Sequence, residues 1–122
     1  MPRAWIALGL ALWIGGCGGA DPDELVGITR GVYGRTQRFD AETGEVSDIE
    51  LDVSSMHEDD GAVRATTSGP HGFYEIGLEP GAYRVCTGSG TCSDVLHVVD
   101  EAWRCDFTAQ ATGGGSWRCS DR

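Results

Sequence analysis

The stretch that most constrains the fold is residues 72–86, in which two segments with alternating apolar side chains flank a turn. Every second side chain of an extended chain lies on one face, so Tyr74, Ile76 and Leu78 share a face. The turn at 79–81, Glu-Pro-Gly, combines a proline that fixes its own φ with a glycine that tolerates positive φ. The alternation then resumes, which predicts a β-hairpin. Because a hairpin alone cannot bury its apolar face, the pattern also requires a second layer.

Short extended segments with turn signals between them continue through the rest of the chain, and no helical period follows the leader at 1–16. The predicted segments outside the hairpin are 26–38, 49–53, 63–67, 95–99, 103–108 and a last one around Trp117. This spacing predicts an all-β fold, an antiparallel β-sandwich of about seven strands over residues 28–122.

The first 16 residues have the pattern of a cleaved signal peptide. Arg3 precedes an uncharged apolar run, 4–13, which is too short for a comfortable membrane-spanning helix. The run ends in Ile-Gly-Gly-Cys at 14–17, which resembles the bacterial lipobox. That resemblance implies cleavage before Cys17 and lipidation of its sulfur, with several acyl chains anchoring the protein stably. Ordinary cleavage after Ala20 is the alternative, and it would release a soluble protein.

The lipobox reading implies a location and a tether. Residues 17–27 would be the lipidated cysteine and a short tether rich in glycine and acidic residues. By resemblance to Gram-negative sorting rules, Gly18 in place of an aspartate points to the outer membrane. We therefore expect a lipid-anchored protein of the bacterial cell envelope, on its periplasmic or its surface face.

Cysteine spacing predicts two disulfides. Five cysteines less Cys17 leave an even four in an oxidising compartment. A Cys86–Cys92 pair places Arg84 opposite Asp94 in the same register. That register also places Tyr83 opposite Val95, an apolar cross-strand pair.

The second predicted pair is Cys105–Cys119, whose register places Asp106 opposite Arg118 and Phe107 opposite Trp117. One bridge joining the two hairpins is the alternative that the spacing leaves open. A zinc site is disfavoured because the spacings contain no Cys-x-x-Cys pair.

Four short motifs lie between residues 31 and 99: Gly-Val-Tyr-Gly at 31–34, Ile-Glu-Leu-Asp-Val at 49–53, Gly-Phe-Tyr at 72–74 and Leu-Glu-Pro-Gly-Ala-Tyr at 78–83. Together they resemble the carboxypeptidase regulatory-like domain, a transthyretin-like β-sandwich. The resemblance implies a non-catalytic accessory that acts as a binding module, a stalk or a carbohydrate-binding domain. The chain departs from the peptidase itself, because His97 is followed three residues later by Asp100 and not by glutamate.

Charge and motif content exclude some functions. The chain has 9 basic and 19 acidic residues, for a formal net charge of −10, which disfavours nucleic acid as a partner. No Gly-x-Ser-x-Gly nucleophile motif occurs, and His57, His71 and His97 are scattered, so we expect no enzyme and no cofactor. The acidic turn 58–60 beside His57 reads as turn chemistry, with calcium binding as the alternative.

Trp103 and Trp117 are the candidate ligand patch of the predicted domain. They either pack in the core or lie exposed together, where they would stack on sugars or dock a protein. The sequence thus predicts a non-catalytic, lipid-anchored binding or structural accessory whose partners are the membrane and an envelope protein or glycan. The alternative is a carbohydrate- or calcium-binding module, secreted or surface-exposed.

Overall fold

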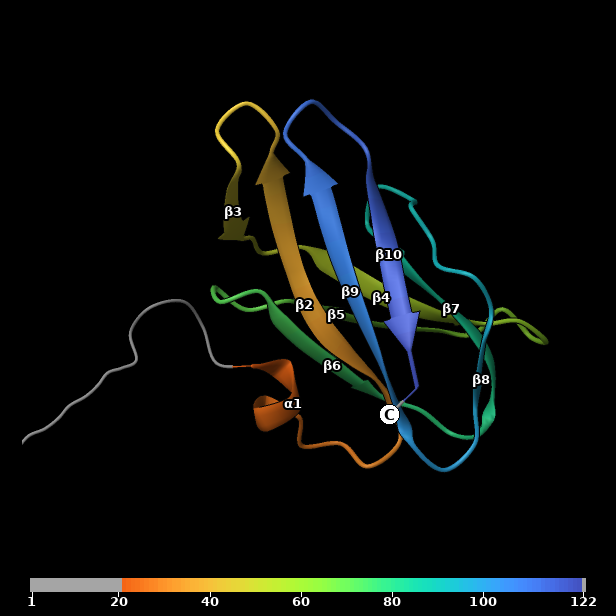
Figure 1. Ribbon diagram of the computed structural model, residues 1–122. Coiled ribbons are helices and arrows are strands. Elements are labelled where there is room, and N and C mark those ends of the chain that lie inside the picture. Colours follow the sequence, from red (N-terminus) through yellow and green to blue (C-terminus); the bar gives the residue numbers. More distant parts are fainter. Residues whose placement is uncertain (1–20, 122) are drawn as a thin grey trace, which may run out of the picture.

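The computed structural model describes residues 21–121, which form nine strands in two sheets and one short helix (Figure 1). Cys17 and the rest of the leader lie outside the described residues. No helix within residues 21–121 is long and apolar enough to cross a membrane. The elements are α1 (Pro22–Leu25), β2 (Gly31–Asp40), β3 (Glu45–Asp48), β4 (Asp52–His57), β5 (Val63–Thr67), β6 (Phe73–Gly77), β7 (Gly81–Thr87), β8 (Leu96–Val98), β9 (Ala102–Gln110) and β10 (Gly115–Ser120).

The central strand of the first sheet is β2, a ten-residue strand that pairs with two different strands along one edge. Its first half, 31–35, pairs with β6 and its second half, 37–40, pairs with β3, both antiparallel. On its other edge β2 pairs with β9 in parallel, and β10 follows β9. The expected sheets were antiparallel. The β2–β9 pair differs because the chain passes through the second sheet before returning as β9, and such a long crossover permits a parallel pair.

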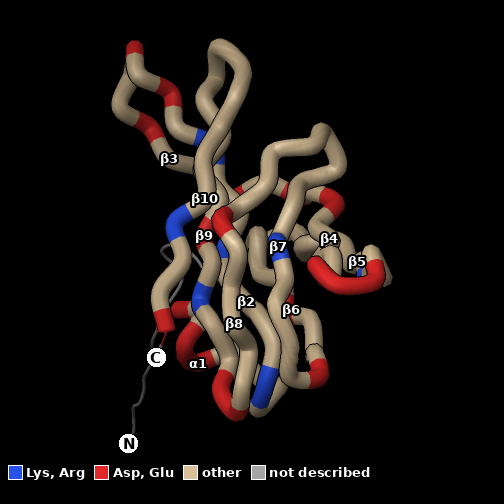
Figure 2. The backbone as a smooth tube through the Cα atoms, turned by 90° about the vertical axis from the view of Figure 1, so that its right-hand side faces the viewer, with Lys and Arg blue, Asp and Glu red and all other residues tan. Residues whose placement is uncertain are grey.

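The second sheet has the order β5-β4-β7-β8 and is antiparallel throughout. β4 and β5 run across β2 and β9 of the first sheet, and the two sheets form the two layers of a sandwich (Figure 1). The all-β sandwich predicted from the sequence is therefore confirmed. Acidic residues gather at the turns, most visibly between β4 and β5, where they remain in solvent (Figure 2).

The predicted hairpin at 72–86 is wrong, because β6 and β7 belong to different sheets. β6 pairs with β2, whereas β7 pairs with β4 and β8. Residues 78–80 therefore form an arch that carries the chain from one sheet to the other. The alternation identified the buried faces correctly, but it does not specify the neighbouring strand. In the arch these apolar faces meet across the core.

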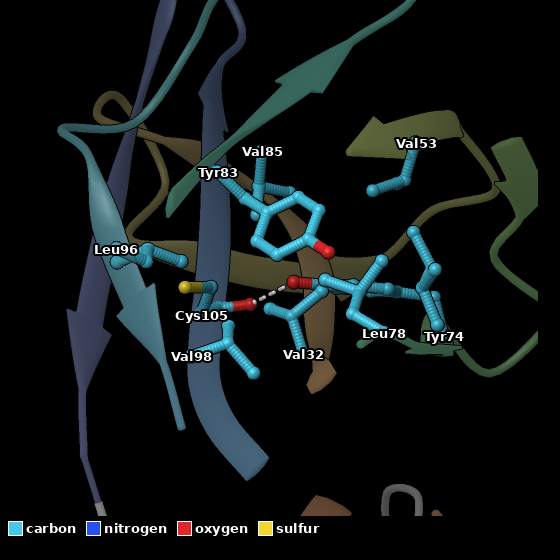
Figure 3. Packing of buried hydrophobic residues seen from close by; sticks show 10 residues of the cluster. Val32, Val53, Tyr74, Leu78, Tyr83, Val85, Leu96, Val98 and Cys105 are labelled. Atoms are coloured by element: carbon cyan, nitrogen blue, oxygen red, sulfur yellow. Dashed lines mark hydrogen bonds between the residues drawn. The ribbon is translucent and has the colours of Figure 1, made fainter. Parts of the chain in front are cut away.

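The core lies between the two sheets and combines aliphatic side chains with two tyrosines (Figure 3). Tyr74 is 2% exposed, and its hydroxyl donates a hydrogen bond of 2.6 Å to the carbonyl of Cys105. Burial raises the pKa of Tyr74 well above its ordinary value, and the nearby Asp106 carboxylate raises it further. The core cluster comprises Val32, Val53, Tyr74, Ile76, Leu78, Tyr83, Val85, Leu96, Val98 and Cys105.

A buried pair of hydroxyls marks the point where β2 changes partner. Thr36 and Ser68 are both fully buried, and the Thr36 hydroxyl donates to Ser68 Oγ at 2.8 Å. Thr36 also contacts the carbonyl of Ile49, and Ser68 Oγ accepts from the amide of Leu51. These bonds satisfy the backbone where residues 49–51 cross between sheets. The strand expected at 49–53 is therefore interrupted, and β4 begins at Asp52.

Helix α1 attaches the beginning of the described chain to the first sheet. Asp21 caps the helix, and Tyr33 donates a hydrogen bond of 2.5 Å to Asp23. Arg104 lies 3.2 Å from a carboxylate oxygen of Asp21 and from one of Asp23. Residues 21–25 fall within the expected tether, and in the structure they are docked on β2 and β9.

Candidate functional site

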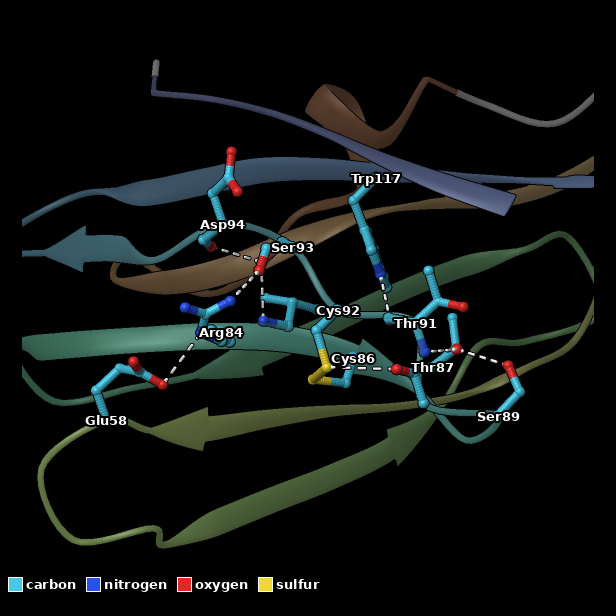
Figure 4. Close-up of a disulfide and its surroundings, with 12 residues drawn as sticks. Glu58, Arg84, Cys86, Thr87, Ser89, Thr91, Cys92, Ser93, Asp94 and Trp117 are labelled. Atoms are coloured by element: carbon cyan, nitrogen blue, oxygen red, sulfur yellow. Dashed lines mark hydrogen bonds and ion pairs between the residues drawn. A yellow bond between two sulfur atoms is a disulfide. The ribbon is translucent and has the colours of Figure 1, made fainter. Parts of the chain in front are cut away.

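The Cys86–Cys92 disulfide forms as predicted and closes the loop after β7 (Figure 4). The first sheet also holds this loop in place, because the indole of Trp117 on β10 donates a hydrogen bond of 2.8 Å to the carbonyl of Thr91. Within the loop, Thr87 Oγ1 accepts from the amide of Thr91 at 3.1 Å. The disulfide thus shapes the loop, and the Trp117–Thr91 hydrogen bond connects the loop to the first sheet at one end of the sandwich.

The register beyond this disulfide differs from the predicted one by a single residue. Tyr83 lies opposite Leu96 and not Val95, because residues 93–95 bulge against the two residues 84 and 85. Ser93 makes the bulge possible, since its hydroxyl accepts the Val85 amide at 3.0 Å in place of a backbone carbonyl.

The bulge also changes the ion pair expected for Arg84. Its guanidinium pairs with Glu58 at 3.4 Å and donates to the carbonyl of Ser93, whereas the predicted partner was Asp94 (Figure 4). An extra residue moves every side chain beyond it to the other face of the strand, so the Asp94 pairing expected from a regular hairpin is lost.

The second predicted disulfide, Cys105–Cys119, is confirmed together with its register. Asp106 lies opposite Arg118, although its carboxylate forms its ion pair with Arg104, at 3.0 Å. Partial burial lowers the pKa of Arg104, but Asp106, Asp23 and Asp21 more than compensate, so the pKa is raised overall. Arg104 therefore links β9 to helix α1 in its charged form.

The two tryptophans of the candidate patch are half-buried and pack against the core. Trp117 contacts the rings of Phe107 and Tyr74, with centroids 5.1 and 6.2 Å apart. Trp103 lies four positions from Phe107 on β9 and donates to the carbonyl of His97 on β8. In the β9–β10 register, the Cys105–Cys119 bridge lies between the two tryptophans. The structure therefore places Trp103 and Trp117 on one inward face without joining them into one patch.

The remaining candidate residues do not converge either. His71 and His97 are exposed and lie on different segments. No three histidine, cysteine, aspartate or glutamate side chains within residues 21–121 gather closely enough to hold a metal ion. Cys17 lies outside the described residues, so its lipidation stays a prediction.

A pocket of about 260 Å³ opens between the second sheet and the β6–β7 arch. Its floor is formed by β4 and β5, where the buried Ser55 lies directly opposite the exposed Arg64. Its walls include Leu78 and Pro80 from the arch and Tyr83 from β7. The pocket thus combines apolar walls with a few polar groups, as small-molecule sites do.

His57 is held firmly at one side of this pocket. Its ring packs edge-on against Tyr83, with centroids 4.9 Å apart. Nδ1 accepts the Asp59 amide at 3.3 Å when the imidazole is neutral, and it lies 3.2 Å from the Asp60 carboxylate, to which it donates when protonated. Both contacts come from the β4–β5 turn, so the acidic turn orients the histidine.

Ser55 is the residue in the pocket whose environment is unusual. It is 1% exposed, and its hydroxyl has no hydrogen-bond partner among residues 21–121. In particular it does not bond to His57, so the two do not form a nucleophile–base pair of the kind that activates a serine.

Sequence reasoning identified His57 and its acidic turn but missed Ser55 and Arg64. Neither belongs to a motif, and they become neighbours only through the β4–β5 register. Alternation along 52–57 would have placed Ser55 on the face shared with Val53, where a hydroxyl is out of place. That was the one local signal available.

Comparisons with protein-family models, with curated proteins and with solved structures find no match for this chain.

Proposed function

We propose that the protein is a non-catalytic binding or structural accessory of the bacterial cell envelope, anchored by lipid at Cys17. The observation that carries this proposal is the use of the cysteines. Four of the five form two disulfides, and the remaining one ends a lipobox-like Ile-Gly-Gly-Cys. Disulfides persist in the oxidising compartments to which a signal peptide directs a protein, so the leader and the two disulfides support the same location.

The docking of α1 sets how close such an anchor would hold the domain. Asp21 already contacts Arg104, so the free span from Cys17 to Asp21 is at most about 13 Å when extended. A tether this short would keep the sandwich next to the bilayer. The partners we propose are therefore the membrane itself and an envelope protein or glycan within reach of it.

A non-catalytic role is supported by the separation of the reactive groups. His57 is engaged by its own turn, and the Ser55 hydroxyl makes no bond to it. The resemblance to the carboxypeptidase regulatory-like domain points in the same direction, since that domain accompanies catalytic domains without sharing their chemistry.

The anchor is tested by labelling cells with radioactive palmitate and fractionating them. We expect the wild-type protein to incorporate label and to sediment with membranes, and Cys17→Ser to lose both properties. Ala20→Phe is the matched control, because a large residue there blocks ordinary cleavage after Ala20 and leaves the lipobox intact. A Cys17→Ser protein that fractionates like the wild type would contradict the anchor.

A further inference from the structure

We propose that the pocket between β4, β5 and the β6–β7 arch binds a small organic carboxylate that carries an apolar body. The carboxylate contacts Arg64 and Ser55, and the apolar part lies against Leu78 and Tyr83. This proposal goes beyond the accessory role, and it holds whether or not Cys17 carries lipid.

The first support is the buried hydroxyl of Ser55. Buried polar atoms in native proteins nearly always have a hydrogen-bond partner, because an unpaired one loses its water without compensation. Ser55 Oγ is buried and has no such partner within residues 21–121, yet the residue lines a pocket. A ligand oxygen bound in the pocket would supply the missing hydrogen bond once the Ser55 side chain turns its hydroxyl toward it.

The second support is the charge of Arg64. Its side chain lies opposite Ser55 in the β4–β5 register, so the two Cβ atoms are neighbours on one face of the sheet, with Ser55 buried and Arg64 exposed at the pocket's edge. One guanidinium N–H donates to the carbonyl of Gly77 at 3.1 Å. No carboxylate among the described residues forms an ion pair with Arg64, although the chain is strongly acidic.

The acids of the pocket form no ion pair with Arg64. Glu79 pairs with Arg30 at 3.1 Å, and Asp60 accepts the Ala62 amide at 2.9 Å and lies 3.2 Å from His57. Within the pocket, the Arg64 guanidinium is therefore left without a carboxylate partner. A guanidinium presents paired N–H groups that match a carboxylate, so a carboxylate is the complementary group.

The size and walls of the pocket define the rest of the ligand. A volume of about 260 Å³ equals that of about nine water molecules in the liquid. The walls from Leu78, Pro80 and Tyr83 are apolar, and the Tyr83 hydroxyl is engaged with the carbonyl of Glu79 at 2.7 Å. An acid with a compact apolar body, of the size of benzoate, meets both conditions.

The test is an NMR titration of the purified full-length protein with sodium benzoate and, in parallel, with benzamide. The two probes have the same shape and differ in charge. We expect saturable amide shifts confined to β4, β5 and residues 78–80, with benzamide binding at least about tenfold more weakly because it lacks the charge-assisted pair. Equal affinities for the two probes, or shifts elsewhere, would overturn the proposal.

Variants then assign the contacts. Arg64→Gln should weaken benzoate binding about tenfold, Arg64→Lys less, and Ser55→Ala about threefold. Arg118→Gln on β10 is the control, since it removes an exposed arginine outside the pocket and should leave binding unchanged. Thermal unfolding of each variant verifies the fold. Unchanged binding in both Arg64 variants would show that the guanidinium does not hold the carboxylate. Unchanged binding in Ser55→Ala would show that the hydroxyl serves a bound water or the fold alone. Either result would overturn the proposed contacts.

Discussion

The ring of His57 lies directly over the backbone of Gly81, so close that a Cβ at residue 81 would come within 2.7 Å of Nε2. The φ of Gly81 is not in the left-handed region, although the Pro-Gly pair had suggested a turn that needs positive φ. The glycine therefore leaves room for the His57 ring, and it permits the contact that fixes one wall of the pocket.

Gly81→Ala should destabilise the protein by about 1–3 kcal/mol, because the methyl group forces the His57 ring away from Tyr83. The free energy of unfolding in urea measures the loss, and the imidazole NMR signals report the displacement of the ring. Gly69→Ala is the matched control, since nothing lies within 4 Å of a Cβ there. Equal unfolding free energies for the two variants would contradict the steric role of Gly81.

The two disulfides should contribute unequally to stability. The chain-entropy model predicts about 3 kcal/mol for Cys105–Cys119, whose sequence separation is 14, and about 2 kcal/mol for Cys86–Cys92, whose separation is 6. Double alanine variants of each pair, compared by urea unfolding, measure both values. A larger loss at Cys86–Cys92 would show that its loop stabilises the domain through its contacts more than through closure entropy.

The Ser93 bulge should depend on the serine hydroxyl. In Ser93→Ala the buried amide of Val85 loses its acceptor, which costs about 1–3 kcal/mol of stability and exposes that amide to hydrogen exchange. Ser116→Ala, on the exposed side of β10, is the control and should change neither quantity. If the Val85 amide stayed protected in Ser93→Ala, the hydroxyl would not be what holds the bulge.

Tyr74 should make the protein sensitive to alkali. Its folded-state pKa is raised above the ordinary value of 10.0, so the folded form keeps its proton while the unfolded chain ionises. The stabilisation is thus fully present below about pH 10 and is lost as the pH rises toward the folded-state pKa.

Tyr74→Phe tests this dependence. We expect it to lower stability near neutral pH by about 1 kcal/mol, because the bond to the Cys105 carbonyl is lost, and to flatten the decline above pH 10. Unfolding curves at several alkaline pH values, with tyrosinate absorbance as a second probe, measure both effects. An unchanged decline in Tyr74→Phe would assign the alkaline sensitivity to other groups.

The features that sequence reasoning predicted correctly are those in which neighbours along the chain are also neighbours in space. The β9–β10 hairpin is the clearest case, because Cys105–Cys119, Asp106 opposite Arg118 and Phe107 opposite Trp117 all follow from one local register. The Cys86–Cys92 bridge is equally local. The strand register predicted beyond this bridge was wrong by one residue. The reason is that the Val85 amide donates to the Ser93 side chain and not to a backbone carbonyl.

By itself the amino-acid sequence determined the all-β class, the buried faces of the strands and both disulfides, because alternation and short-range pairing are properties of a local segment. Only the tertiary structure decided that 72–86 is an arch and not a hairpin, and that β2 and β9 run parallel. It also decided that Ser55 and Arg64 share a pocket with His57. The reason is that a strand's partner depends on which distant apolar faces can be buried together, and no local pattern contains that information.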